Sequence, residues 1–306
     1  MSETMVVEAS RRFGTVSPLR YPGGKAALAG LFADLISDLG LREPCYVEPY
    51  AGGVGAGIAL LRQDLIDHLV VNDIDPAVHA FWFSVVKHNA EFVDRVGTVP
   101  LTIDEWHRQR SIYRLGDATD PMALGFAFFY LNRTNRSGVL NAGVIGGQAQ
   151  TGNYLIDARF NRSTLASRLR EIGERSHRIT VSDLDGRTVI GRYSDDPCVF
   201  MYIDPPYVQA GSQLYLNAFD GRDHNALCRM IDSIGSAHWL LTYDAVPRVE
   251  LLYNHHFHCK LKLNYSARHH GKAEELLVAS PRVANALRRI TMLATTGPRA
   301  AAESQG

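Results

Sequence analysis

The chain has 306 residues, of which 46% are hydrophobic and 21% charged, and its 32 basic residues balance its 32 acidic ones. Such a composition indicates an ordinary soluble globular protein, long enough for one large domain or one domain with an inserted lobe. A net charge of zero argues against a protein that coats nucleic acid nonspecifically. No apolar run approaches the roughly 18–20 residues of a membrane span, and the N-terminus has no signal-peptide pattern, so we expect a cytoplasmic protein.

Cysteine and histidine patterns do not indicate a metal site. The cysteines form no CxxC pair, so we expect reduced, buried thiols at Cys45, Cys198, Cys228 and Cys259. His255, His256 and His258 alternate beside Phe257 like one face of a strand, and no carboxylate stands nearby at ligand spacing. We therefore expect no metal there.

The segment up to residue 83 has the pattern of a β-turn-α-β unit. In chain order it predicts a helix, a strand, a glycine-rich turn, a helix and a strand ending in an acid, at 28–39, 45–48, 51–57, 58–66 and 68–73. Pro76 suits the first turn of a further helix. This succession is the unit of a parallel, doubly wound sheet.

The strand pattern fades between 84 and 175. Helical patterns at 102–115 and 121–132 precede a stretch rich in Gly, Asn, Thr and Ser (133–153), which leads into another helix. A long irregular stretch inside a compact protein is usually functional or disordered. Further strands are predicted at 178–183, 198–204, 238–244, 257–265 and 274–280, with a helix near 222–235.

We therefore predict an α/β fold: a Rossmann-like sheet with helices on both faces and an inserted, mainly helical lobe between its second and third strands. The sheet domain is expected to comprise 17–83 and 176–285, the insert 84–175, and a flexible tail 286–306. No self-complementary apolar seam is visible, so we expect a monomer.

Two motifs are typical of ligand contacts. In CYVEPYAGGVGAG the glycines follow a strand, and Asp73 ends the next strand, 25 residues after Glu48. Glycines there let the backbone approach a ligand, and the acid can accept ribose hydroxyls. Because no GK[ST] follows, an adenosine-containing cofactor without a triphosphate is favoured. PGGK (22–25) begins a helix and suits an anion such as a carboxylate, although a plain turn with a surface lysine is the alternative.

The most specific motif is DPPY, directly after the apolar strand VFMYI. It should lie at the carboxyl edge of the sheet, where open α/β folds bind ligands. The prolines lock the backbone and leave their carbonyls free to accept. The Asp204 carboxylate and the Pro205 carbonyl could then accept both hydrogens of one amino group, and Tyr207 could stack on its ring. Hydrogen bonds of this kind localise the lone pair on the amino nitrogen instead of leaving it delocalised into the ring. The nitrogen needs this localised lone pair to attack a methylsulfonium.

Together these motifs resemble the Dam-like family of DNA adenine-N6 methyltransferases, over roughly residues 17 to 280. The order of cofactor site, target-recognition insert and catalytic DPPY is similar, and AEELLV (273–278) also resembles the family. Tyr50 stands where Phe is more usual, and Val54 departs from the second glycine of FxGxG. The resemblance implies S-adenosylmethionine as cofactor, contacted by Tyr21, Gly24, Lys25, Glu48, Tyr50, Gly52, Gly53, Asp73, Asp183 and Asp204. Asp73 would bind the ribose and Asp183 the adenine.

The resemblance also implies a mechanism. An adenine flips out of double-stranded DNA into the pocket, its amine is held by Asp204 and Pro205, Pro206 stiffens the loop, and Tyr207 stacks on the base. No metal is needed. YLNRTNRSGVLN (130–141) resembles the DNA-contacting segment, with contacts expected from Arg133, Asn135 and Arg136. Residues 131–180 hold eight arginines against three acids, in keeping with a nucleic-acid surface.

Several alternatives stay open at this point. The same fold could methylate RNA or a protein glutamine amide, or cytosine N4, although Ser is then more common at position 204. An NAD-binding oxidoreductase would give no role to DPPY. A DNA-binding module without activity would be expected to have lost the DPPY or PGGK residues, yet both motifs are intact. A helical insert with arginines before DPPY favours duplex DNA. A cognate restriction endonuclease is a possible further partner, as in restriction–modification systems.

Overall fold

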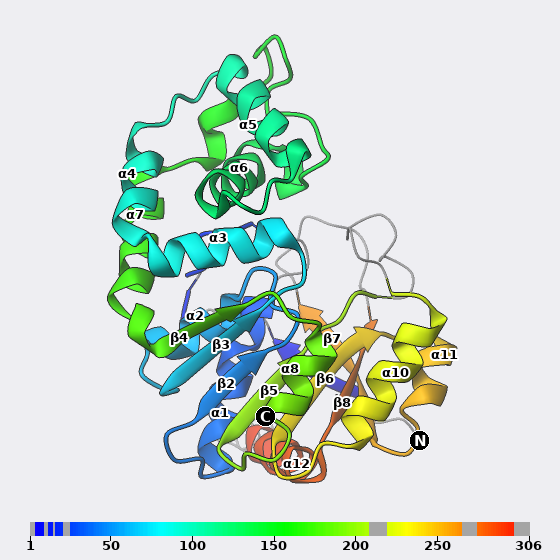
Figure 1. Ribbon diagram of the computed structural model, residues 1–306. Coiled ribbons are helices and arrows are strands. Elements are labelled where there is room, and N and C mark those ends of the chain that lie inside the picture. Colours follow the sequence, from blue (N-terminus) through cyan, green and yellow to red (C-terminus); the bar gives the residue numbers. More distant parts are fainter. Residues whose placement is uncertain are drawn as a thin grey trace, which may run out of the picture.

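The computed structural model describes residues 4–8, 12–14, 16–20, 25–207, 219–264 and 274–296. Its strands form one mixed sheet of eight in the order β1-β7-β8-β6-β5-β2-β3-β4 (Figure 1). Their bounds are β1 Thr4–Glu8, β2 Cys45–Glu48, β3 His68–Asn72, β4 Ile179–Ser182, β5 Val199–Ile203, β6 His238–Asp244, β7 Phe257–Asn264 and β8 Glu274–Ala279. All neighbours are parallel except the two pairs made by β8. β1 was not predicted, because its short apolar run is too brief to give a periodic pattern.

The strand order creates a crevice beside β2. From β2 the chain builds outward through β3 and β4 on one side, then returns to place β5 and β6 on the other. The order therefore reverses between β2 and β5, and open α/β sheets bind ligands outside the carboxyl ends of the strands at such a switch point. The glycine turn follows β2 and DPPY follows β5, so the fold brings the two motifs together.

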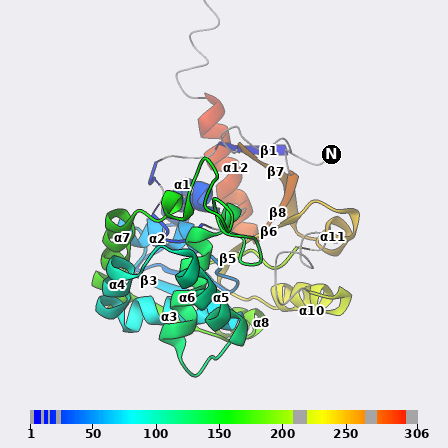
Figure 2. The ribbon, with the colours of Figure 1, turned by 90° about the horizontal axis from the view of Figure 1, so that it is seen from above.

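Helices cover both faces of the sheet, as predicted. Tyr46 and Phe200 belong to one buried cluster, which the helices α1, α2 and α12 share, whereas Val47 and Met201 belong to a second, shared with α8, α10 and α11. Alternate strand residues thus point to opposite faces, and Figure 2 shows α1 and α12 on the side opposite α8 and α10. These helices span Ala29–Asp38 (α1), Gly55–Arg62 (α2), Gly186–Arg192 (α8), Gly221–Asp232 (α10), Pro247–Leu252 (α11) and Pro281–Thr296 (α12).

The segment between β3 and β4 is largely helical. It contains α4 Asn89–Thr98, α5 Ile103–Leu115, α6 Pro121–Thr134 and α7 Arg162–Glu174, and α5 and α6 stack beyond α3 (Pro76–Lys87) in Figure 1. α6 crosses α3 closely, since a Cβ at Gly125 would lie 2.5 Å from the Ala80 carbonyl oxygen. Phe81 of α3 stacks on Phe129 of α6 at 5.8 Å. The insert therefore shares one continuous core with the sheet domain.

Two expected boundaries need correction. The boundary at 84 falls inside α3, which begins at Pro76 as predicted and continues to Lys87. The tail expected from 286 is helical to Thr296, because Val283, Ala286 and Leu287 bury an apolar face of α12 in the core. None of the described helices has the length and apolar character needed to span a bilayer.

Candidate active site at the carboxyl edge of the sheet

Among the residues that the structure describes, the Asp204 carboxylate is hydrogen-bonded through only one of its two oxygens. It follows β5, whose five residues are all buried. Its Oδ1 accepts hydrogen bonds from Thr242 Oγ1 at 2.8 Å and Tyr207 Oη at 3.0 Å, and lies 3.6 Å from Lys25 Nζ. Among the described residues no hydrogen bond ends on Oδ2 or on the Pro205 carbonyl oxygen. The carboxylate is therefore oriented through one oxygen, while the other and the neighbouring carbonyl can accept from a substrate.

Lys25 holds the DPPY loop in place through buried hydrogen bonds. The buried ammonium donates to both Glu275 carboxylate oxygens, at 2.7 and 2.8 Å, and to Tyr207 Oη at 2.7 Å. Burial raises the pKa of Glu275, and the adjacent Lys25 counteracts this. Burial, with the charge of Asp204, holds the pKa of Tyr207 well above its usual range, so it stays a phenol. In this structure the anion beside Lys25 is the Glu275 carboxylate, and the expected contact of Lys25 with the cofactor stays a prediction.

The glycine turn is braced by Asp73. Its Oδ2 accepts the Gly52 N–H at 2.9 Å and its Oδ1 accepts the Asp75 N–H at 3.0 Å. Burial raises the pKa of Asp73 to about 6. Val54, two residues along the turn, has φ +46°, a left-handed conformation that costs a non-glycine residue on the order of 1–3 kcal/mol. The position where a glycine was expected therefore keeps a glycine-like backbone.

Glu48 is a buried acid at the end of β2. Its Oε1 accepts the Gly57 N–H at 3.2 Å, and the side chain is almost fully buried. Burial raises the pKa of Glu48 to about 8, with a further upward contribution from the charge of Asp204. The carboxyl is therefore largely protonated at neutral pH unless a cation binds beside it.

The other expected cofactor contacts have different surroundings. Tyr50 packs under α8 so closely that a side chain at Gly186 would collide with its ring. The Gly53 carbonyl accepts from Ser17 Oγ at 2.7 Å. Asp183 is exposed directly after β4, next to Ser182, whose carbonyl accepts the Asp73 N–H at 3.2 Å. Tyr21 and Gly24 lie outside the described residues.

The three expected DNA contacts differ in exposure. Arg133 is half-buried and donates through Nε and Nη2 to the Arg159 carbonyl. Burial, together with neighbouring arginines, lowers its pKa to about 10. Asn135 is fully buried: its Oδ1 accepts from Trp106 Nε1 at 2.7 Å, and its Nδ2 donates to two turn carbonyls. A direct contact from Asn135 does not fit this structure, whereas Arg136 is exposed.

The sequence model of the D12 class N6 adenine-specific DNA methyltransferases matches residues 21–266. The chain belongs to this class. It is therefore an enzyme that methylates N6 of adenine in DNA. Among solved structures, the rRNA methyltransferase aviRa from Streptomyces viridochromogenes is similar, with 14% identity and a TM-score of 0.35, over 87% of this chain and 89% of that chain. No curated protein matches.

Three further positions at this candidate site had no role predicted from the sequence. Thr242 bonds Asp204, and Glu275, which lies in AEELLV, neutralises Lys25. Asn72 is completely buried at the end of β3 and uses its whole amide, donating to the Pro49 and Leu184 carbonyls and accepting from Ser182 Oγ and the Leu184 N–H. It therefore ties together the ends of β2, β3 and β4. A lone amide closing an apolar strand was its only signal in the sequence.

The buried Lys25–Glu275 pair should matter both for stability and for the catalytic loop. Lys25→Met is expected to lower the free energy of unfolding by about 3–5 kcal/mol, because it leaves a buried carboxylate unpaired. Lys25→Met with Glu275→Leu should recover most of this loss yet keep a low kcat, since Tyr207 stays unanchored. Urea unfolding and methyl-transfer rates measure both quantities. Arg289→Ala, which breaks the exposed pair with Asp38, is the control and should cost under about 1 kcal/mol. An equally small effect of Lys25→Met would contradict the proposed anchoring.

Proposed function

We propose that the methyl donor is S-adenosylmethionine and that it binds between the carboxyl ends of β2 and β5. Glu48, Asp73, Asp204 and Glu275 supply four carboxyl groups, against the one ammonium of Lys25 among the described side chains that contact them. This excess of acid suits a ligand with a net positive charge. S-adenosylmethionine carries a sulfonium and an ammonium against one carboxylate, whereas its demethylated product is neutral overall and should leave more readily.

The donor set fits the parts of this molecule. The Asp73 carboxylate is largely but not fully buried directly after β3, where it can accept ribose hydroxyls. Glu48 can lose its proton and pair with the ammonium group of the cofactor. Asp183 lies beside Asp73, within reach of the amino group of the cofactor's adenine. When bound, the cofactor supplies an electrophilic methyl group on a sulfonium. The protein then has only to place and activate the nitrogen that accepts this methyl group.

In the proposed mechanism the target adenine leaves the stack of duplex DNA and enters the crevice. Asp204 Oδ2 and the Pro205 carbonyl accept the two hydrogens of its 6-amino group, which concentrates the lone pair on nitrogen. Thr242 and Tyr207 hold Asp204 in this orientation through Oδ1. Pro206 keeps the loop rigid, and the Tyr207 ring is available to stack on the base. Asp204 Oδ2 is also within reach of the proton that the methylated nitrogen must lose.

The observation that carries this proposal is the one-sided bonding of Asp204 beside the acid-rich crevice. Calorimetric titration of the purified protein with S-adenosylmethionine should give one site per chain. S-adenosylhomocysteine should bind more weakly, and ATP, which has the adenosine but adds phosphates, should not compete. Failure to bind S-adenosylmethionine, or competition by ATP at similar concentrations, would reject this cofactor.

We further propose that the insert contacts the DNA backbone through Arg136. Arg136→Ala should reduce the slope of log binding constant against log salt concentration by about one unit, since one phosphate contact is lost. Arg133→Ala should mainly lower stability, because Arg133 caps the Arg159 carbonyl. Arg192→Ala, an exposed change at the end of α8 away from the insert, is the matched control. Salt slopes that are equal for wild type and Arg136→Ala would remove this residue from the interface.

A further inference from the structure

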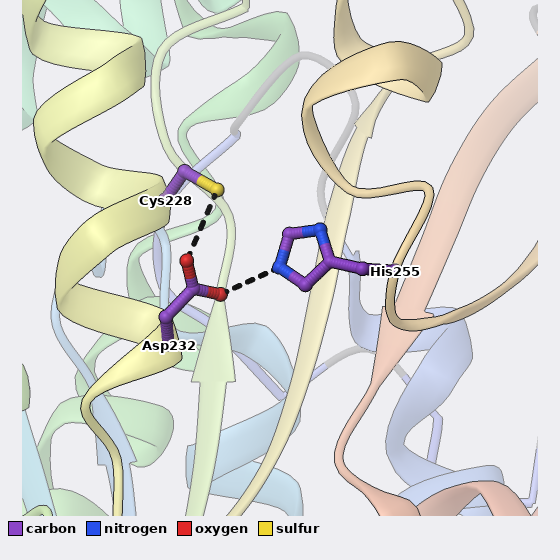
Figure 3. Close-up of side chains that lie close together, drawn as sticks. All are labelled: Cys228, Asp232 and His255. Carbon is purple, nitrogen blue, oxygen red and sulfur yellow. Dashed lines mark hydrogen bonds and ion pairs between the residues drawn. The ribbon is translucent and has the colours of Figure 1, made fainter.

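Three potential metal ligands, with a second histidine beside them, lie together at the edge of the sheet opposite the catalytic loop. Cys228 and Asp232 lie one turn apart on the same face of α10, and His255 and His256 occupy the turn before β7. Asp232 Oδ1 is 2.8 Å from His255 Nε2 and 2.7 Å from His256 Nε2. Figure 3 shows Cys228, Asp232 and His255 turned toward one another.

No carboxylate stands at ligand spacing from these histidines in the sequence, but the fold brings Asp232 within hydrogen-bonding distance of two of them. Asp232 comes from α10, more than twenty residues earlier in the chain, and its side chain accepts from both imidazoles. The two histidines are consecutive, yet their rings lie 4.3 Å apart and point to the same oxygen, because they sit in a turn and not in the strand. His258 is not part of the cluster: its Nδ1 bonds the His256 carbonyl.

We propose that Cys228, Asp232 and His255, assisted by His256, form a structural zinc site. The ligand atoms of the first three lie within 4.8 Å of one another, and Cys228 Sγ is 3.8 Å from Asp232 Oδ2. Bonds of about 2.0–2.3 Å in a tetrahedral zinc site place ligand atoms about 3.3–3.8 Å apart. The Cys228 sulfur already lies at such a separation from the Asp232 carboxylate. The two imidazole nitrogens are closer to that carboxylate and would each have to move away from it by about half an ångström.

The ligand chemistry selects the metal. A thiolate, a carboxylate and the His255 imidazole, with the His256 imidazole beside them, suit zinc or its analogue cobalt. Calcium and magnesium prefer oxygen ligands alone. Cys228 is buried, but the side chains of His255 and Asp232 are 50% and 40% exposed, so an ion can reach the cluster from solvent. On binding, the ion displaces the thiol proton to solvent, and each coordinating imidazole binds as the neutral tautomer that is protonated at Nδ1.

The position of the cluster gives the ion a structural role. It would link the end of α10 to the turn before β7. This link lies beside Trp239 of β6, whose ring is 5.1 Å from that of His256. The first turns of α10 carry His224, which bonds Tyr243 in the aromatic cluster next to Tyr207. The metal would therefore stabilise the helix that supports the catalytic side of β6, without touching the reacting groups.

Metal titration of the full-length protein tests this site. After chelator treatment, the wild type should bind one equivalent of zinc, and cobalt should give the visible bands of a tetrahedral site with a thiolate charge-transfer band. His255→Ala and Cys228→Ala should weaken zinc binding by at least about 100-fold, since even losing an outer partner costs about 10–100-fold. The exposed His177→Ala is the matched control and should bind as the wild type does.

A second readout does not depend on the buried cysteine. Zinc should raise the unfolding temperature of the wild type and of His177→Ala but not that of His255→Ala. Because the His255 side chain is half exposed, its variant should fold and unfold like the chelated wild type. Equal zinc affinity in wild type and His255→Ala, or no binding by the wild type, would overturn the proposal and leave a hydrogen-bonded cluster only.

Discussion

Asp204→Ala is expected to lower kcat for methyl transfer by about 10³-fold or more, while the dissociation constant for S-adenosylmethionine changes only a few-fold. The substitution removes the oxygen that accepts from the target amine, and positioned groups of this kind contribute on the order of 10²–10⁴ in rate. It also frees the hydroxyls of Thr242 and Tyr207, which hold the carboxylate through Oδ1. Single-turnover rates and calorimetry separate the two effects.

Asp204→Asn is the matched variant for this experiment. Asparagine keeps one carbonyl oxygen that can accept from a substrate amine but loses the negative charge, so its rate should fall between those of wild type and Asp204→Ala. Unchanged cofactor binding shows that each variant is folded. An alanine variant with full activity would remove Asp204 from the mechanism.

Glu48→Gln is expected to stabilise the protein above neutral pH while weakening cofactor binding. The pKa of Glu48 is raised to about 8 in the folded chain, so the folded state holds a proton that the unfolded state releases near its ordinary value of about 4.5. The wild type therefore loses stability as pH rises from about 4.5 to 8, by up to about 1.4 kcal/mol per unit. Glutamine keeps an acceptor for Gly57 and cannot ionise, so its gain should reach about 2–4 kcal/mol at pH 8 and nearly vanish at pH 4.

The same substitution should separate stability from function. Without an ionisable partner for the cofactor ammonium, S-adenosylmethionine affinity should fall by about 10- to 100-fold, as expected for a lost charge-assisted hydrogen bond. Cofactor binding by the wild type at pH 7 should release protons, which calorimetry in buffers of different ionisation enthalpy measures. The exposed change Glu43→Gln should alter neither property. A pH profile of unfolding that is parallel for wild type and Glu48→Gln would contradict the assigned pKa.

The places of the DPPY and glycine-turn motifs in the fold could be predicted from the sequence, because they depend on neighbouring residues. Asp204 directly follows an apolar strand, and Asp73 ends the next strand after the glycine turn, so both had to reach the same edge of a parallel sheet. These positions depend on strand periodicity and rigid loops, which are properties of neighbouring residues. The α/β class and the helical character of the insert follow from the same periodicity.

Other features depend on pairing between distant segments. Glu275 meets Lys25 only because β8 inserts antiparallel between β6 and β7, 250 residues along the chain. Asn135 was expected to contact DNA, yet Trp106 and the carbonyls of its own turn use its whole side chain. Asp232 likewise approaches His255 and His256 only in the folded chain, because α10 and the turn before β7 are distant in sequence but packed together. No local pattern encodes such partners.

We propose that this protein transfers a methyl group from S-adenosylmethionine to N6 of adenine in duplex DNA. The most direct test of this activity is to incubate the purified protein with unmethylated genomic DNA and methyl-labelled S-adenosylmethionine, then digest the DNA to nucleosides and separate them. The label is expected in N6-methyladenine, and Asp204→Ala should leave the DNA unlabelled. Label in N4-methylcytosine alone, or none in DNA, would contradict this account.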